Sequence, residues 1–216
     1  MTCPICNSTE TEKEISGILN YYKCGICDVS FNTRKEKQIY NPKITLMQKL
    51  IWNIPYSYYN SERLDFIKQL EKGKVLDIGS GNGKFLYMLK LKGWETQGVE
   101  PIKNYAEFAS KSLGIKTFNE FFEDFETDEK FDLITLLFTI DHTNDPLCVF
   151  EKIHSMLKSG GHLFIASPFA VYHEQHNFIF TEKTFDFLLE KFSFVKIKSE
   201  INYKPVRNLF ILAQNK

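Results

Sequence analysis

The chain has 216 residues, with 27 lysines and arginines against 27 aspartates and glutamates, so its formal net charge is zero. This length accommodates one sizeable domain plus a small appendage, and the balanced charge gives no overall field that would attract nucleic acid, which argues against a nucleic-acid partner. The longest apolar run, residues 133–140, is too short to span a bilayer, and the first residues contain neither a basic stretch nor an apolar signal region. We therefore expect a cytoplasmic protein that does not bind membranes.

The first motif consists of two Cys-x-x-Cys pairs, Cys3 with Cys6 and Cys24 with Cys27, separated by 17 residues. Four thiolates on two tight turns are typical of a closed tetrahedral zinc site, in which iron is the lesser competitor. Disulfides are the alternative, and a cytoplasmic location disfavours them. We predict a structural zinc ribbon over residues 1–35, with a hairpin strand at 21–23. The fifth cysteine, Cys148, is expected to be a small buried hydrophobe.

Residues 36–72 are predicted to form a helical linker or lid. Apolar residues recur at helical spacing over 44–51, and a second helical pattern runs from 61 to 70, with Asn60 or Ser61 as its cap and Gly73 as its stop. The aromatic residues Trp52 and 56–59 either pack a loop against the core, which we favour, or cover a ligand.

The most informative segment is residues 74–85, where a short apolar run is followed by Asp77 and by glycines at 79, 81 and 83. This order predicts a buried parallel strand, a tight turn and a helix whose free N–H groups face a ligand. A dinucleotide loop requires glycine where Lys84 stands, and a phosphate loop requires a hydroxyl where Phe85 stands. A ligand with an amino-acid group and an adenosine, and without phosphates, suits the loop better. An ordinary strand-to-helix turn is the alternative.

A second strand pattern, residues 95–99, ends at Glu100 and Pro101. Glu100 follows Gly79 by 21 residues, close to the spacing at which an acid at the end of the second strand binds ribose hydroxyls. A solvated acid at a strand end is the alternative, but the preceding loop favours ribose binding.

Residues 75–83, 98–101, 131–146 and 157–168 resemble, in order and spacing, the class I S-adenosylmethionine-dependent methyltransferases. The resemblance implies an α/β fold in which residues 73–216 form a Rossmann-like, seven-stranded, mostly parallel sheet with flanking helices. It also implies a turn at 157–161 and a final antiparallel hairpin of strands 194–198 and 209–213. A helix is expected from residue 181 onward, with Thr181 and Thr184 as competing caps.

The resemblance further implies roles for individual residues in binding S-adenosylmethionine. The glycine loop would approach the methionine part of the cofactor, Asp77 would lie near its ammonium group, and Glu100 would hold the ribose. Residues 119–121 occupy the place where the family surrounds the adenine, and the segment from Phe138 to His142 would line the sulfonium side. The implied cofactor-binding residues are Asp77, Gly79, Ser80, Gly81, Gly83, Glu100, Pro101, Asn119, Glu120, Phe121, Phe138 and His142.

The loop at 168–181 is expected to hold the methyl acceptor, because ligands in this fold lie beyond the carboxyl ends of the strands. It resembles a subset of the family that has a zinc-binding N-terminus, and His176 and Thr181 match that subset's pattern, while Tyr172 is one residue out of step. Some of those relatives act on nucleotide-linked sugars or other small metabolites. A histidine is a natural base at neutral pH, and our candidates are His176 first, then His142, then His173, with Tyr172 as a further candidate. Each histidine could instead orient the substrate or have a structural role.

The sequence thus predicts a methyltransferase that uses S-adenosylmethionine on a small-molecule acceptor, such as a sugar or another biosynthetic metabolite, and that carries a structural Zn²⁺. One alternative is a zinc-ribbon scaffold protein whose cofactor-binding domain is not catalytic. The other is a methyltransferase that acts on RNA or protein.

Overall fold

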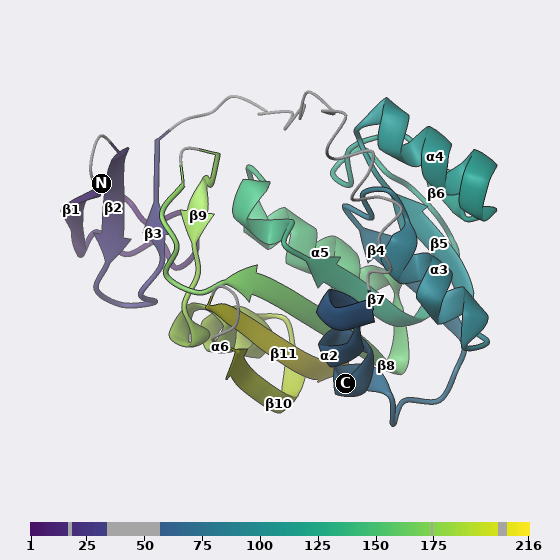
Figure 1. Ribbon diagram of the computed structural model, residues 1–216. Coiled ribbons are helices and arrows are strands. Elements are labelled where there is room, and N and C mark those ends of the chain that lie inside the picture. The colour runs from purple at the N-terminus through teal and green to yellow at the C-terminus, as the bar shows by residue number, and fades with distance from the viewer. Residues whose placement is uncertain (17–18, 34–56, 174, 203–206) are drawn as a thin grey trace.

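A computed structural model describes residues 1–16, 19–33, 57–173, 175–202 and 207–216 (Figure 1). The predicted helix over 44–51 and the aromatic residues Trp52 and Tyr56 lie outside the described residues.

The larger of two sheets has seven strands, in the order β10-β11-β8-β7-β4-β5-β6 (Figure 1). Pairing is parallel from β8 through β7, β4 and β5 to β6, whereas β11 is antiparallel to both β8 and β10. The strands are β4 (Lys74–Ile78), β5 (Glu95–Val99), β6 (Lys116–Phe118), β7 (Phe131–Leu137), β8 (Leu157–Pro168), β10 (Phe194–Asn202) and β11 (Asn208–Asn215). The predicted Rossmann-like sheet with a final antiparallel hairpin is confirmed.

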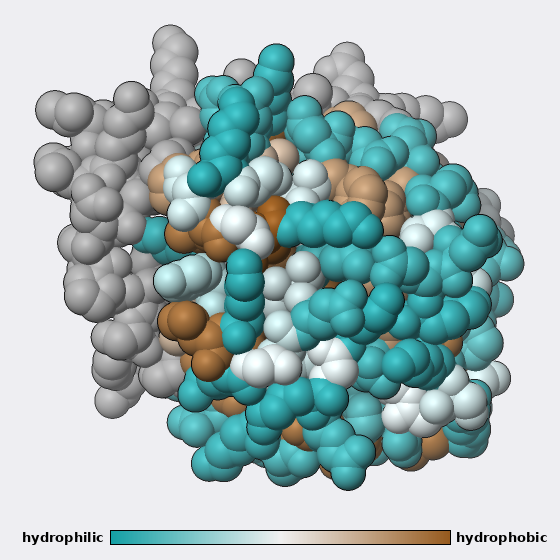
Figure 2. All heavy atoms as spheres, turned by 90° about the vertical axis from the view of Figure 1, so that its right-hand side faces the viewer, coloured by the Kyte–Doolittle hydropathy of each residue, from teal (hydrophilic) through white to brown (hydrophobic). Residues whose placement is uncertain are grey.

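Both faces of the central strands of this sheet are buried, which explains their near-continuous apolar character. Successive residues of a strand face opposite sides, so Ile165 and Ile211 pack with α5 and α6, whereas Phe164 and Phe210 pack with α2, α3 and α4. The helices are α2 (Ser57–Ile67), α3 (Lys84–Leu91), α4 (Lys103–Leu113), α5 (Pro146–Met156) and α6 (Glu182–Lys191), with a short 3₁₀ turn, η1 (Ile140–His142). The side of the molecule that bears α3 and α4 is mostly hydrophilic at its surface (Figure 2).

Three local predictions differ from the structure. The α2 helix begins at Ser57, so neither Asn60 nor Ser61 is its cap; its start precedes Leu64 and Ile67, the apolar residues that indicate the helix in the sequence. Cys148 is half-buried rather than buried.

The third difference concerns the predicted turn at 157–161. The β8 strand already begins at Leu157, opposite Phe131, and its regular pairing resumes at His162, opposite Leu133. Gly160, with φ of 76°, absorbs the irregularity between these two pairs, so the segment stays in the strand. At the start of α6, Thr181 and Thr184 do not compete as caps, because their side chains form a reciprocal capping box.

The smaller sheet combines the N-terminus with a segment from the far end of the chain. Its order is β1-β2-β3-β9, formed by β1 (Thr11–Ser16), β2 (Leu19–Cys24), β3 (Ser30–Phe31) and β9 (Phe178–Ile179). The predicted strand at 21–23 lies in β2. Figure 1 shows this sheet beside the larger one, connected to it through the loops that flank β9.

No described helix is both long enough and apolar enough to cross a membrane.

Candidate functional site

The order of strands in the large sheet reverses at β4, which has β5 on one side and β7 on the other. In open α/β sheets the crevice beyond the carboxyl ends of such strands binds ligands. A mostly apolar cavity of about 310 Å³ lies at this position. The residues that line it lie at or beyond the carboxyl ends of β4, β5, β6 and β7: Ile78, Gly79, Gly81, Val99, Glu100, Pro101, Ile102, Tyr105, Phe121, Phe122, Glu123, Phe138, Thr139, His142 and Thr143. We call it the cofactor cavity.

The three glycines of the loop after β4 have different structural roles, although all have positive φ. A Cβ on Gly79 would lie 2.3 Å from the Thr139 hydroxyl, and one on Gly83 would lie 2.6 Å from the Ala109 Cβ on α4. A Cβ on Gly81 would meet no protein atom within 4 Å. Gly79 and Gly81 line the cofactor cavity, whereas Gly83 lets α3 begin close against α4.

Glu100, only 4% exposed, lies at the end of β5 on the wall of the same cavity. Its Oε2 accepts a hydrogen bond from the Gly81 N–H, and its Oε1 accepts one from the Ile102 N–H, both at 2.8 Å. Burial raises the pKa of this carboxyl group, and the two backbone donors oppose that shift. Each carboxylate oxygen keeps acceptor capacity, so Glu100 can also accept hydrogen bonds from ligand hydroxyls.

Asp77 and Ser80 lie beside the cofactor cavity but do not line it. Asp77 is buried in β4, where its Oδ1 accepts a 2.6 Å hydrogen bond from the Thr135 hydroxyl. Burial raises the pKa of Asp77 to about 7, while the Thr135 hydroxyl and the charge of Arg63 act in the opposite direction. The Ser80 hydroxyl is buried and has no hydrogen-bond partner among the described residues.

The predicted cofactor-binding residues after β5 and β6 also divide into those that line the cavity and those that do not. Phe121 and Pro101 line the cavity, whereas Asn119 and Glu120 do not. The Asn119 side chain donates to the backbone oxygens of Glu100 and Pro101, at 2.9 and 3.0 Å, and so fixes the shape of the turn after β5. Tyr105, which the sequence did not single out, completes this apolar end of the cavity.

Phe138, directly after β7, has a strained backbone with φ of 55°. Its N–H donates to the Ala166 carbonyl at 2.7 Å, which holds the residue in this conformation. The Arg63 guanidinium of α2 lies 4.8 Å from the centre of the Phe138 ring. Arg63 therefore brings a positive charge toward both Asp77 and the cavity wall. No sequence pattern pointed to this residue, since it belongs to a helix outside the glycine-loop motif.

A second cavity, of about 370 Å³, adjoins the first and shares Phe138 and His142 with it. We call it the acceptor cavity. Its other lining residues come from the end of β8, the loop that follows it and the start of β11: Pro168, Val171, His173, Gln175, His176 and Asn208. The structure thus brings together the three histidines that the sequence proposed as bases.

Two of these histidines are held in one tautomer by backbone carbonyl groups. His142 Nδ1 lies 2.9 Å from the Gln175 oxygen, and His176 Nδ1 lies 3.0 Å from the Val171 oxygen. Because a carbonyl oxygen only accepts, each Nδ1 is the donor, and each neutral ring keeps an unprotonated Nε2. Burial lowers the pKa of His142 and lowers that of His176 to about 4, so both rings are neutral at neutral pH.

The other two candidates are placed differently. His173 is exposed at the rim of the acceptor cavity, and its Nδ1 accepts a hydrogen bond from the Gln175 N–H at 3.2 Å. Tyr172 does not line the acceptor cavity. Its hydroxyl donates to Glu14 of β1 at 2.7 Å, and its ring packs edge-on against Tyr21 of β2. Tyr172 therefore contacts the small sheet.

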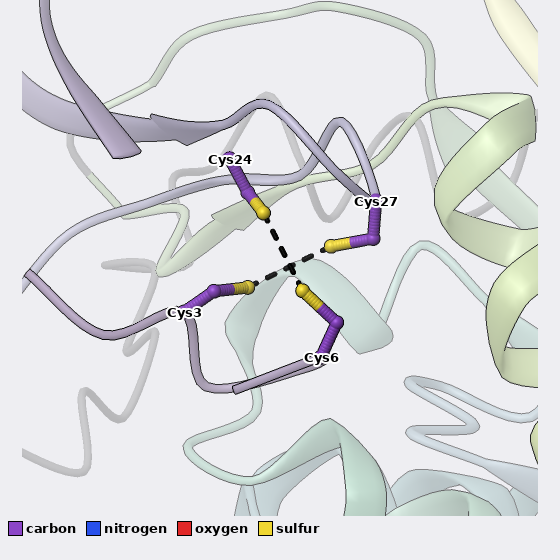
Figure 3. A group of neighbouring side chains, drawn as sticks. All are labelled: Cys3, Cys6, Cys24 and Cys27. Atoms are coloured by element: carbon purple, nitrogen blue, oxygen red, sulfur yellow. Dashed lines mark hydrogen bonds between the residues drawn. The ribbon is translucent and has the colours of Figure 1, made fainter. Parts of the chain in front are cut away.

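The four cysteines of the two motifs converge at one end of the small sheet (Figure 3). All four sulfur atoms lie within 4.8 Å of one another, with 3.6 Å between Cys3 and Cys27 and 3.4 Å between Cys6 and Cys24. Zinc–sulfur bonds of about 2.3 Å in a tetrahedron place sulfurs about 3.8 Å apart, so the arrangement suits a metal of this size. None of the four thiols forms a disulfide. The hydrogen bond with the Cys27 thiol lowers the pKa of Cys3 to about 5.

Comparison with known proteins agrees with the site geometry. Residues 54–198 match the family model described as "Methyltransferase domain". An ubiquinone biosynthesis O-methyltransferase of Actinobacillus pleuropneumoniae is 31% identical over 128 residues, which cover 52% of this chain and 55% of the relative. An uncharacterized methyltransferase of Staphylococcus carnosus is 28% identical over 112 residues, covering 50% of this chain and 54% of the relative. The chain thus matches about half the length of these curated relatives.

Solved structures with the same fold are more distant in sequence. A 1,6-didemethyltoxoflavin-N1-methyltransferase of Burkholderia thailandensis, solved with S-adenosylhomocysteine, superposes with a TM-score of 0.66 at 15% identity, covering 96% of this chain and 100% of that one. The N-methyltransferase NodS of Bradyrhizobium japonicum gives a TM-score of 0.62 at 17% identity, covering 73% and 94%. Because the family model matches well over half of the chain, the protein belongs to the methyltransferase domain family and contains an S-adenosylmethionine-dependent methyltransferase domain.

Proposed function

We propose that this protein transfers the methyl group of S-adenosylmethionine to a hydroxyl or amino group of a small molecule. One observation carries the proposal: the cofactor cavity and the acceptor cavity meet at Phe138 and His142. A methyl donor in the first cavity and an acceptor in the second would face each other across these two side chains. S-adenosylmethionine supplies an electrophilic methyl group on a sulfonium.

The cofactor cavity supports a donor that extends from Phe121 to Phe138. Glu100 binds the ribose hydroxyls, and Phe121 and Tyr105 pack around the adenine. The amino-acid end of the donor is zwitterionic, so it needs one negatively and one positively charged side chain nearby. Asp77, buried in β4 two residues before Gly79, provides a negative charge near the ammonium group. Arg63, whose guanidinium lies 4.8 Å from the Phe138 ring on the cavity wall, provides a positive charge for the carboxylate.

Among the histidines, His142 is the best candidate for the general base, and His176 becomes the second. His142 lines both cavities, whereas His176 lines only the acceptor cavity. As the acceptor oxygen or nitrogen forms its bond to the methyl carbon, the carbon–sulfur bond breaks and its electron pair stays on sulfur. The Nε2 of His142 takes the proton that the acceptor loses. Phe138 and His142 align the two reactants, which is most of what an in-line transfer requires.

The walls of the acceptor cavity indicate the class of acceptor. Two neutral imidazoles present hydrogen-bond acceptors, so they complement a hydroxyl or amino group that donates. Pro168, Val171 and Phe138 add apolar surface. A cavity of about 370 Å³ suits a small molecule better than a macromolecule. The relatives whose printed names specify the methylated atom are O- and N-methyltransferases, which supports the same class.

We also propose that Cys3, Cys6, Cys24 and Cys27 bind Zn²⁺ as a structural ion. Four sulfur ligands leave no coordination position for a substrate, so the ion stabilises the N-terminal sheet and does not itself contact the reacting groups. The domain division at residues 1–35, 36–72 and 73–216 remains part of this proposal.

The experiment is a methyl-transfer assay of the full chain with labelled S-adenosylmethionine and a panel of small phenols, sugars and amines. We expect label in at least one small acceptor, and we expect His142→Gln to reduce turnover while His154→Gln, which lies on α5 and lines neither cavity, does not. Transfer only to RNA or protein would contradict the proposed substrate class. Tight binding of the donor with no transfer to any acceptor would favour a non-catalytic scaffold.

A further inference from the structure

The methyltransferase domain shares a sheet with the cysteine unit, by which we mean the four cysteines together with β1, β2 and β3. The connection is made by β9, which belongs to the loop at 168–181, here called the acceptor loop, and pairs with β3. Phe178 and Ile179 of β9 lie opposite Phe31 and Ser30 of β3. The residues just before β9, including His176, form the wall of the acceptor cavity. The N-terminal sheet is therefore continuous with the segment that presents a candidate base, as the side-by-side position of β3 and β9 shows (Figure 1).

Tyr21 of β2 makes the most direct contact between the two parts. Its side chain is 1% exposed, and its hydroxyl lies 2.8 Å from the backbone oxygen of His173 and 2.8 Å from that of His176. A phenol has one proton to donate, so the two carbonyl groups share it. This contact fixes the backbone at His173 and at His176.

Asn32, just after β3, continues the connection. Its side-chain nitrogen donates to the His176 oxygen at 2.8 Å, and its N–H donates to the Asn177 oxygen at 3.0 Å. Asn177 in turn donates from its side chain to the oxygens of His142 and Thr143, and from its N–H to the Asp141 oxygen at 2.7 Å. An unbroken series of hydrogen bonds therefore leads from the small sheet to the turn that carries His142.

The cysteines lie at the ends of the strands that make these contacts. Cys24 is the last residue of β2, which carries Tyr21, and Cys27 lies three residues before β3, which Asn32 follows, so a metal held by the four cysteines would join the two strands. A sheet of such short strands is only marginally stable by itself, and a bound metal can stabilise it. By contrast, Gly81 and Glu100, on which cofactor binding depends, belong to the large sheet and its loops.

We propose that the metal-loaded cysteine unit positions the acceptor loop, so that metal occupancy controls the acceptor step and leaves cofactor binding unchanged. Tyr21 and Asn32 are positioning residues, since they act through the backbone of His176 and Asn177. This inference rests on the proposed function of the acceptor cavity, and its test therefore includes readouts that do not depend on catalysis.

The first test compares the full chain loaded with zinc and the same protein after treatment with a chelator and a reductant, both saturated with S-adenosylhomocysteine. We expect amide hydrogen exchange in peptides over 171–180 to increase at least tenfold without metal, while peptides over 74–83 keep their protection. The dissociation constant of S-adenosylhomocysteine should change less than twofold. Unchanged exchange over 171–180 would overturn the inference, as would loss of S-adenosylhomocysteine binding or failure of the protein to take up either zinc or iron.

The second test uses Tyr21→Phe, with Tyr22→Phe as its matched control. Tyr22 follows Tyr21 in β2 and its ring lies 6.0 Å from that of Phe31, so the control removes the same hydroxyl from the other face of the strand. Tyr21→Phe should accelerate exchange over 171–180 and lower kcat/KM for the acceptor about tenfold, the equivalent of one buried hydrogen bond, with unchanged S-adenosylhomocysteine affinity. Equal effects of the two variants would overturn the inference. Failure of wild type to methylate any acceptor, with the exchange response intact, would refute the proposed function alone.

Discussion

At the scale of single residues, the two ends of the site differ in how their polar groups are held. Glu100 is fixed by two backbone N–H groups and remains available to a ligand on its free lone pairs. His142 and His176 are fixed by carbonyl groups, which leaves their Nε2 atoms as acceptors. The cofactor cavity thus offers a buried carboxylate with acceptor capacity to spare, and the acceptor cavity offers two neutral imidazoles.

Replacing Glu100 with Gln should weaken binding of S-adenosylhomocysteine about 10- to 100-fold. An amide keeps only one oxygen acceptor, and its NH₂ group would face the backbone donors of Gly81 or Ile102, which corresponds to about 1–3 kcal/mol. Isothermal titration calorimetry measures the change. The matched control is Glu107→Gln, since Glu107 pairs with Lys111 on the surface of α4 and should not affect affinity. Equal affinities of the two variants would show that Glu100 does not hold the ribose.

Replacing His142 with Gln should lower kcat by about 10²- to 10⁴-fold, the range for loss of a general base, with a smaller change in donor affinity. In the wild type, burial lowers the pKa of His142, so the acidic limb of the kcat profile should lie below pH 6.5. His154→Gln serves as the control. A wild-type kcat profile whose acidic limb has its midpoint above pH 6.5 would exclude His142 as the base. A His142→Gln variant with normal kcat would exclude it as well.

Asp141 gives a pH-dependent stability test. Burial raises its pKa to about 7, well above the value of about 3.9 for an unfolded aspartate, and its Oδ2 has no partner among the described residues. The folded state therefore binds the proton more tightly, and the stability that this residue contributes is present below pH 4 and lost as the pH rises through about 7. Asp141→Asn cannot ionise, so its free energy of unfolding should increase relative to wild type between pH 4 and pH 8.

Urea unfolding at several pH values measures this difference, with Asp65→Asn as the exposed control. Asp65 pairs with Lys68 on the surface, and exposed pairs of this kind contribute little, so its substitution should change the free energy of unfolding little over the same pH range. A constant difference for Asp141→Asn as well would mean that its carboxyl group titrates normally in the folded protein.

At the scale of elements, the acceptor loop lies between two ordered anchors. Its start is fixed by β8, and its end is fixed by β9 and by the capping box at the start of α6. Both anchors matter because the loop presents His176 and His173 to the acceptor cavity. The N-terminus of α6 therefore contributes both to stability and to the placement of the loop.

Replacing Thr181 with Ala should lower the free energy of unfolding by about 1 kcal/mol, because the Thr184 N–H loses its side-chain acceptor at the start of α6. Thr181→Ser keeps the hydroxyl and should restore most of the stability. Urea denaturation of the two variants measures the difference. Similar losses for alanine and serine would show that packing of the threonine methyl group, and not the cap, is responsible.

At the scale of the whole molecule, the sequence predicts the large sheet well, and Gly79, Gly81 and Glu100, which it singles out, line one cavity at the edge of that sheet. Glycine spacing, Glu100 and the apolar strands are local patterns, and each predicts a local structure for a known physical reason. The contact between Tyr21 and His176 joins residues 155 positions apart, and no local pattern encodes it. The contacts of Arg63 with Phe138, of Gly83 with Ala109 and of Tyr172 with the small sheet likewise depend on packing between elements that lie far apart in the chain.

The most direct test of the account is a crystal structure of the full chain with S-adenosylhomocysteine. We predict that the ribose hydroxyls lie within hydrogen-bond distance of the Glu100 carboxylate, and that the sulfur atom faces the boundary formed by Phe138 and His142. A ligand bound elsewhere, or one whose sulfur points away from the acceptor cavity, would contradict the proposed methyl transfer between the two cavities.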